Sequence, residues 1–271
     1  MSEWMGLALV LAVIACAYGG SCLYVYLTQF DKVFHIPRKG AETPADWGLD
    51  YEEWMIDNQG KRLHTWWIPG APQRPVVLFC HGNGVTIRHL AKQVKFLRLL
   101  DVGICLFDYQ GYGDSEGEVG EMAFCTDASA VWWHLVTKRG LKAENLLVYG
   151  HSLGGGVAAW LAGRHPCGGV ILEGTFTSIP DLAVDHYPWL PVRRLARIDF
   201  NNLDNIKKIK VPLLIVHSTE DEIIPFHHGE TLFNHAGGPK RLLPIRGRHV
   251  DALVSMGEVG CFAIRDFFHI G

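Results

Sequence analysis

Residues 145–162 have the sequence NLLVYGHSLGGGVAAWLA, and this stretch decides how the chain is expected to fold. Residues 145–149 are an apolar run typical of a buried strand, and residues 157–162 are alanine-rich and favour a helix. Between them, residues 150–154 follow the pattern G-x-S-x-G, whose glycines permit a sharp turn. The stretch therefore predicts a strand, a tight turn that exposes the hydroxyl of Ser152, and a helix whose positive N-terminus points at that serine.

The rest of the chain alternates in a way that predicts the fold class. Two runs, residues 51–56 and 62–68, flank a turn-like segment and predict a β-hairpin. Five continuous apolar runs have the character of parallel strands buried on both faces: 76–80, 103–107, 146–149, 169–172 and 213–216. Helices are expected between and after them, at 87–100, 122–138, 157–164 and 253–268. This order predicts an α/β fold with a mostly parallel, doubly wound sheet and an antiparallel edge.

The N-terminal segment differs from the rest in its hydrophobicity. Residues 7–27 form an apolar run of roughly 21 residues, which is enough to span a bilayer. No charged residue lies between Glu3 and Asp31, and Trp4 and Tyr26 stand where interfacial aromatic residues belong. The alternative is a cleaved signal peptide, but its first residues should carry Lys or Arg, and these carry only Glu3. We therefore expect one retained transmembrane helix.

These features divide the chain into three expected parts: a transmembrane anchor (4–30), a linker (31–46) and a catalytic domain (47–271). A small insertion is expected at about 178–210 and has two interpretations, a lid over the site or a plain surface helix and loop.

The first basic residues come after the apolar run and none precedes it, so the positive-inside rule favours a cytoplasmic catalytic domain. These are Lys32, Arg38 and Lys39. The seven cysteines, an odd number without framework spacing, suit the same reducing compartment.

Composition and charge exclude some classes of protein. The formal net charge is −3, and no basic stripe is present, so no nucleic-acid partner is expected. No cofactor is expected either. The pair His227-His228 has no companion carboxylate at ligand spacing, so the sequence predicts no metal site. Nothing in the sequence favours a particular oligomeric state.

A serine is a weak nucleophile unless a base removes its proton and an acid orients the base. When the nucleophile follows a strand in a G-x-S-x-G turn, the acid and the histidine come later in the chain, each after a strand. Asp221 follows the apolar run 213–217, and His249 follows the run 240–245 and precedes the last helix. We therefore predict a catalytic triad of Ser152, Asp221 and His249.

Other residues compete for these roles. The chain has 14 histidines, and position rather than residue type favours His249 over its rivals. Those rivals are expected to be surface residues of helices or strands: His217, His227, His228 and His235. Among the acids, Glu220 and Glu222 flank Asp221, and Glu173 follows the strand 169–172 and could serve in a variant geometry. The required order favours Asp221.

The reaction also needs two backbone N–H groups that face the developing oxyanion. Leu153, the residue after the nucleophile, is expected to supply one. The second is expected from the glycine-rich loop after the first buried strand, with Asn83 as the first choice and Gly84 as the second. His81 in the same loop is expected to hold the shape of the loop.

Five motifs in order resemble the α/β-hydrolase superfamily: residues 81–84 (HGNG), 107–117 (FDYQGYGDSEG), 150–155 (GHSLGG), 173–178 (EGTFTS) and 219–225 (TEDEIIP). Within it, the chain is similar to the Bem46-like group of membrane-anchored serine hydrolases, and also to the ABHD13 and ABHD17 proteins. The resemblance extends from about Tyr51 to the C-terminus. It implies the Ser152-Asp221-His249 triad and an N-terminal anchor. Gln110 stands where such proteins often carry arginine and is expected to support its loop.

The sequence thus predicts a membrane-anchored serine hydrolase that cleaves acyl esters or thioesters through an acyl-enzyme, with small-molecule or lipid-like acyl substrates. A serine peptidase or amidase with the same triad is one alternative. A non-catalytic binding protein on a hydrolase scaffold is another, although such proteins usually lack one of the catalytic residues.

Overall fold

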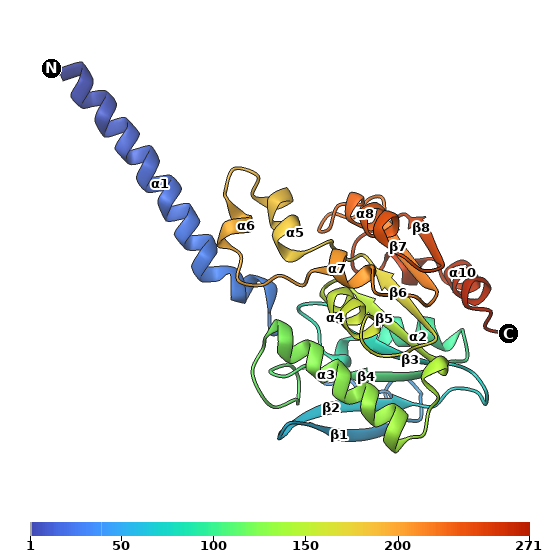
Figure 1. The fold of residues 1–271 in the computed structure, drawn as a ribbon. Helices are drawn as coiled ribbons and strands as arrows, with labels where there is room; N and C mark the ends of the chain where they lie inside the picture. The colour runs from blue at the N-terminus through green and yellow to red at the C-terminus, as the bar shows by residue number, and fades with distance from the viewer. Residues whose placement is uncertain (1, 39) are drawn as a thin grey trace.

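A computed structural model describes residues 2–38 and 40–271 of the chain. Within these residues, eight strands form one sheet in the order β1-β2-β4-β3-β5-β6-β7-β8 (Figure 1). The strands are β1 (Glu52–Asn58), β2 (Lys61–Ile68), β3 (Val76–Cys80), β4 (Gly103–Phe107), β5 (Leu146–His151), β6 (Gly169–Glu173), β7 (Leu213–Ser218) and β8 (Lys240–Ile245). β2 pairs antiparallel with β1 and β4, and all other pairs are parallel. The predicted α/β fold, mostly parallel with an antiparallel hairpin at one edge, is confirmed.

Helices cover both faces of the sheet because its central strands are buried on both sides. One face packs against α3 (Glu121–Trp133), α4 (Leu153–Ala162), α7 (Asn202–Ile206) and α8 (His227–His235). The other packs against α2 (Ala91–Arg98), α9 (Ala252–Ser255) and α10 (Glu258–Phe268). Consecutive residues of a strand point to opposite faces, so that each face has its own hydrophobic core. In β3, Leu78 belongs to one core and Phe79 to the other. Single turns of 3-10 helix precede α2 (Ile87–His89) and β5 (Ala143–Asn145).

Three expected helices are interrupted in the structure. The one expected over 87–100 consists of the 3-10 turn Ile87–His89 and the separate helix α2. The helix expected over 122–138 begins as α3 and continues as a π-helical turn, His134–Lys138, in which the Thr137 hydroxyl donates to the Trp133 carbonyl. The helix expected over 253–268 breaks into α9 and α10, because Gly257 takes a left-handed conformation with φ of 52°. Short breaks of this kind leave the apolar periodicity nearly unchanged.

The N-terminal helix α1 (Ser2–Val33) projects away from the sheet, and its residues 3–20 are exposed (Figure 1). Its length and apolar composition would allow it to cross a membrane, and these are properties that a signal sequence shares. Its C-terminal end is fixed to the domain by Phe34, whose ring packs edge-on against Phe124. Lys39, one of the basic residues after the apolar run, lies outside the described residues.

The segment expected as an insertion, residues 178–210, leaves the sheet after β6 and carries α5 (Ile179–His186), α6 (Val192–Leu195) and α7. α6 lies beside the C-terminal half of α1, and α5 packs against α6 (Figure 1). Gln29 of α1 links the two parts: it donates to the Leu195 carbonyl at 3.2 Å and accepts from the Arg197 backbone N–H at 2.7 Å. The anchor helix and the insertion are therefore joined by hydrogen bonds.

Gly154, in the first turn of α4, lies against the end of β3. A Cβ atom there would lie 2.0 Å from the Cys80 carbonyl oxygen, which is backbone and cannot move aside cheaply. We predict that Gly154→Ala lowers the free energy of unfolding by at least about 2 kcal/mol and the melting temperature by about 4–8 °C. Gly120→Ala is the control, because a Cβ there meets only Ala123, at 3.8 Å. Equal melting temperatures for the two variants would contradict the packing described here.

Candidate active site

Ser152 lies in the turn between β5 and α4, with φ of 54° and ψ of −120°. A non-glycine residue in such a conformation costs about 1–3 kcal/mol and persists only where its surroundings hold it. Two bonds hold it here: the Ser152 N–H donates to the Glu173 carbonyl at 2.9 Å, and the Thr175 hydroxyl donates to the Ser152 carbonyl at 2.8 Å. The turn thus projects the serine hydroxyl from the carboxyl end of the sheet, as G-x-S-x-G predicts.

His249 lies within hydrogen-bond distance of both other residues of the predicted triad. His249 Nε2 lies 2.9 Å from Ser152 Oγ, and His249 Nδ1 lies 2.7 Å from Asp221 Oδ2. Asp221 comes from the loop after β7 and His249 from the loop after β8, 97 residues from Ser152 in the sequence. An imidazole in this position can accept the serine proton on one nitrogen while the carboxylate orients the other.

Asp221 is held in its ionised form. Burial alone would raise the pKa of Asp221, but the hydrogen bond from His249 and the backbone N–H groups of Ile223 and Ile224 outweigh it. They hold the pKa below the usual range for aspartate. Those two N–H groups donate to Oδ1 at 2.9 and 2.8 Å, which leaves Oδ2 for the imidazole. The carboxylate is therefore charged and oriented at neutral pH.

The loop that carries His249 is fixed by acids that the sequence pattern did not single out. Glu222 accepts the backbone N–H of His249 at 3.1 Å, and Glu220 accepts that of Gly247 at 3.2 Å. The Ser218 hydroxyl donates to the Gly247 carbonyl at 2.5 Å. Glu220 and Glu222 thus hold the histidine loop while Asp221 faces the ring. Only their position beside Asp221 pointed to the site.

The two residues predicted to supply the oxyanion hole, Leu153 and Asn83, line the same cavity as Ser152. Leu153 is the first residue of α4, where backbone N–H groups lack partners within the helix. The side chain of Asn83 is occupied: it accepts from the His35 N–H and the Tyr112 hydroxyl and donates to the Lys32 carbonyl. The backbone N–H of Asn83 stays the predicted second donor, with that of Gly84 as the alternative.

The serine opens into a cavity of about 340 Å³ with mostly apolar walls. Val33, Leu90, Phe176, Ile179 and Leu182 are among its lining residues, together with His151, Ser152 and His249. His151 is partly buried, and burial lowers the pKa of its ring. Such walls suit an apolar group beside the reacting bond.

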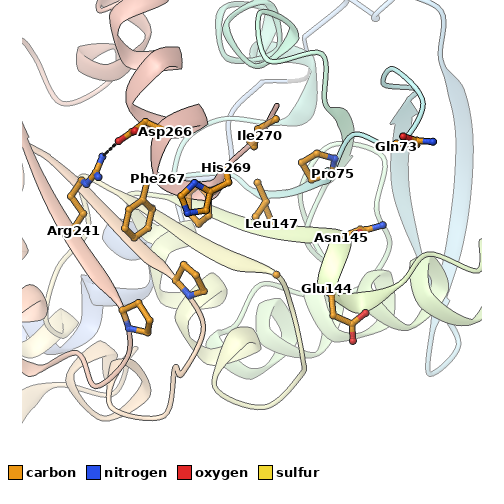
Figure 2. A pocket seen from close by; sticks show the side chains of 14 residues that line it. Gln73, Pro75, Glu144, Asn145, Leu147, Arg241, Asp266, Phe267, His269 and Ile270 are labelled. Carbon is orange, nitrogen blue, oxygen red and sulfur yellow. Dashed lines mark hydrogen bonds and ion pairs between the residues drawn. The ribbon is translucent and has the colours of Figure 1, made fainter.

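A second hollow, of about 480 Å³, lies at the opposite edge of the sheet (Figure 2). Its lining includes three prolines that each directly precede a strand: Pro75, Pro212 and Pro239. Arg241 and Asp266 also line it and form an ion pair at 2.8 Å. Among the described residues of this lining, none is a serine or a cysteine. In open parallel sheets, ligands bind at the carboxyl ends of the strands, which is the edge that carries Ser152.

Comparisons with known proteins agree with this fold. A family model described as "Serine aminopeptidase, S33" matches residues 71–200. The chain is 31% identical over 267 residues to an uncharacterized protein of Mycobacterium tuberculosis, a match that covers 95% of this chain and 93% of the relative. It is 32% identical to the "Alpha/beta hydrolase domain-containing protein WAV2" of Arabidopsis thaliana, over 80% of this chain and 78% of that protein. The chain belongs to the α/β-hydrolase domain-containing family.

The α/β-hydrolase fold is also seen in solved structures. The structure of the esterase Pf2001 of Pyrococcus furiosus superposes with a TM-score of 0.71 at 19% identity, over 86% of this chain and 96% of that one. Together, the family model, the α/β-hydrolase relatives and the esterase neighbours support a hydrolase. The resemblance to α/β-hydrolases is therefore confirmed at the level of family and fold.

The competing titratable residues have other partners. His217 is buried below Asp221 and its Nε2 donates to the Ile224 carbonyl at 2.8 Å. His235 donates from Nδ1 to the Thr231 carbonyl, one turn earlier in α8. Glu173, the alternative acid, is bonded by the Tyr149 hydroxyl and by the Leu253 N–H. These contacts occupy all three side chains away from Ser152.

Two expectations about the histidines were wrong. His217 and His228 were expected at the surface, and both are buried. His227 and His228 do have a companion carboxylate, because α5 brings Asp185 to within 3.1 and 2.8 Å of their Nε2 atoms, and the three groups could hold a metal ion. This contact was not predictable from spacing, because 42 residues separate Asp185 from His227. However, the Thr177 backbone N–H donates to His228 Nδ1 at 3.1 Å, which keeps the proton of the neutral ring on Nε2. We therefore interpret the cluster as a hydrogen-bonded link between α5 and α8.

Proposed function

We propose that this protein is a membrane-anchored serine hydrolase that cleaves acyl esters or thioesters through an acyl-enzyme. The observation that carries the proposal is the position of His249, whose two ring nitrogens lie 2.9 Å from Ser152 Oγ and 2.7 Å from Asp221 Oδ2. A serine in a strained turn, a base and a charged acid in this order are what nucleophilic acyl transfer needs.

In the first half of the proposed reaction, Ser152 Oγ forms a bond to the substrate carbonyl carbon as its proton passes to His249 Nε2. The backbone N–H groups of Leu153 and Asn83 stabilise the oxyanion, and Asp221 stabilises the imidazolium. The intermediate then collapses, the bond to the alcohol or thiol breaks, and that leaving group takes the proton from Nε2. The acyl group remains on Ser152.

In the second half, a water molecule attacks the acyl carbon and gives a proton to Nε2. Collapse of this second intermediate breaks the bond to Oγ, releases the carboxylic acid and returns the proton to Ser152. Metal ions take no part in either half of this proposal. The apolar lining of the cavity around Ser152, with Phe176, Ile179 and Leu182, supports acyl groups as substrates.

The membrane anchorage in this proposal is supported by the length and composition of α1. We propose that residues 4–30 remain as a single-pass anchor and that the domain over 47–271 is cytoplasmic. All seven cysteines are free, which suits that compartment. A helix that holds the site beside a bilayer makes lipid-like acyl compounds accessible as substrates.

A peptidase with the same triad is the second candidate, and the description of the matching family model favours it. Amide and ester attack use the same groups, so substrate preference has to separate them. The test is a panel of p-nitrophenyl esters (acetyl, butanoyl, octanoyl), an octanoyl thioester and aminoacyl p-nitroanilides, with the full chain in detergent. We expect kcat/KM for octanoyl to exceed that for acetyl by at least about tenfold, because added methylene groups gain burial. Faster cleavage of the anilides would favour the peptidase, and a sharp preference for acetyl would contradict lipid-like substrates.

A further inference from the structure

A second apolar cavity, of about 360 Å³, lies between α1 and the insertion. We call it the α1 groove. It is lined by Val25 and Gln29 of α1, by residues of α5 such as Ala183, and by Val192 and Leu195 of α6. Lys32, Val33, Ile179 and Leu182 line both this groove and the cavity that contains Ser152. The two cavities therefore share a wall.

The polar groups at the edge of the α1 groove are already paired. Gln29 is bonded to Leu195 and Arg197, and Lys32 Nζ donates to the Tyr187 hydroxyl at 3.2 Å. The remaining lining is mostly aliphatic. A groove with few free donors and acceptors recognises an unbranched apolar chain better than a peptide, whose backbone groups need partners.

The position of the insertion along α1 indicates where the groove opens. The loop after α5 places Tyr187, Trp189 and Leu190 beside Ala17 to Val25, in the apolar part of the helix. Trp189 is 65% exposed although it lies next to this helix. If α1 crosses a bilayer, this loop lies at the depth of the adjacent leaflet. Arg193, Arg194 and Arg197 follow it, exposed, and basic residues suit the level of the lipid head groups.

The end of α1 is also bonded to the loop that carries the expected oxyanion donor. Asn83 donates to the Lys32 carbonyl at 3.3 Å and accepts from the His35 N–H at 2.8 Å. A wall of the groove and a wall of the reaction site thus belong to one hydrogen-bonded unit. A chain lying in the groove would have a fixed position relative to Ser152.

We propose that the α1 groove binds the acyl chain of a long-chain lipid ester or thioester, which enters from the leaflet beside α1. The carbonyl would lie at Ser152 and the chain would pass Ile179 and Leu182 and continue between α1 and α5. This inference rests on the proposed function, and it adds that the anchor helix itself forms part of the substrate site. The anchor would then do more than concentrate the enzyme at the membrane.

The test is to fill the groove from each side. Val25→Trp fills it from α1 and Ala183→Phe fills it from α5, and Val13→Trp is the matched control on an exposed part of the same helix. The full chain in phosphatidylcholine vesicles is given hexadecanoyl and butanoyl p-nitrophenyl esters. We expect the ratio of kcat/KM for the two esters to fall by at least about tenfold in both groove variants, because about two or more methylene groups lose their burial. The control should keep the wild-type ratio.

An unchanged ratio in both groove variants would overturn the groove assignment while leaving the proposed function intact. A second measurement needs no turnover: Ser152→Ala protein in the same vesicles is labelled with a photoreactive hexadecanoic acid, and the labelled peptides are identified by mass spectrometry. We expect label on residues 179–196 and 22–33, lost when Val25→Trp is added. Label elsewhere, or label that Val25→Trp does not reduce, would overturn the assignment. A wild type that cleaves no ester, with label in the groove, would instead contradict the proposed function.

Discussion

Replacing Ser152 with alanine is expected to lower kcat for p-nitrophenyl butanoate by roughly 10⁴-fold or more, because the members of a catalytic triad act as a unit. The substitution removes Ser152 Oγ, which lies 2.9 Å from His249 Nε2 and would form the bond to the acyl carbon. Substrate binding should change little, because the apolar walls of the cavity remain. The measurement is steady-state hydrolysis by the purified full chain in detergent.

Ser255→Ala is the control for this variant. Ser255 is exposed, and its hydroxyl donates to the Asp251 carbonyl one turn earlier. Its loss should leave kcat within about twofold of wild type, as is usual for surface substitutions away from the site. Persistence of most of the activity in Ser152→Ala would show that another residue carries the reaction.

Replacing Asp221 with asparagine is expected to lower kcat by about 10⁴-fold while KM changes little. An aspartate accepts the proton of His249 Nδ1 and so leaves Nε2 free to accept the serine proton. Asparagine can instead donate to Nδ1, which places the ring proton on Nε2, facing Ser152. The backbone N–H groups of Ile223 and Ile224 would still have an amide oxygen to bond, so the loop should fold.

Two further variants test whether the loss of activity is specific to Asp221. Asp266→Asn at the opposite edge of the sheet should keep kcat within about twofold, since it removes only an exposed ion pair with Arg241. Glu173→Gln tests the alternative acid, whose carboxylate contacts Tyr149 and Leu253. If Glu173→Gln abolished activity and Asp221→Asn did not, the acid would be Glu173.

The sequence predicted the sheet because its central strands are buried on both faces and are therefore continuous apolar runs. The strand–turn–helix around Ser152 was predictable for a related reason, since only glycine tolerates the close contacts at Gly150 and Gly154. Chain order then pointed to Asp221 and His249, because catalytic residues in this fold follow successive strands. Local chemistry and strand order thus contained most of the expected site.

Contacts between distant segments were not predictable in the same way. The bonds from Asn83 to Lys32 and His35, and from Asp185 to His227 and His228, depend on how two packed elements meet. No periodicity or spacing in the sequence indicates which distant segments form such contacts. The sequence therefore indicated the candidate catalytic residues, and the structure was needed to find that α1 lines a cavity that adjoins them.

The most direct test of the account is covalent labelling with a fluorophosphonate, which reacts with an activated serine. The full chain is labelled in detergent, digested and analysed by mass spectrometry, beside Ser152→Ala and Ser255→Ala. The account predicts one modified peptide, with the label on Ser152 in wild type and Ser255→Ala, and no label in Ser152→Ala. An unlabelled wild-type protein, or equal labelling of Ser152→Ala, would contradict the assignment of Ser152 as the nucleophile.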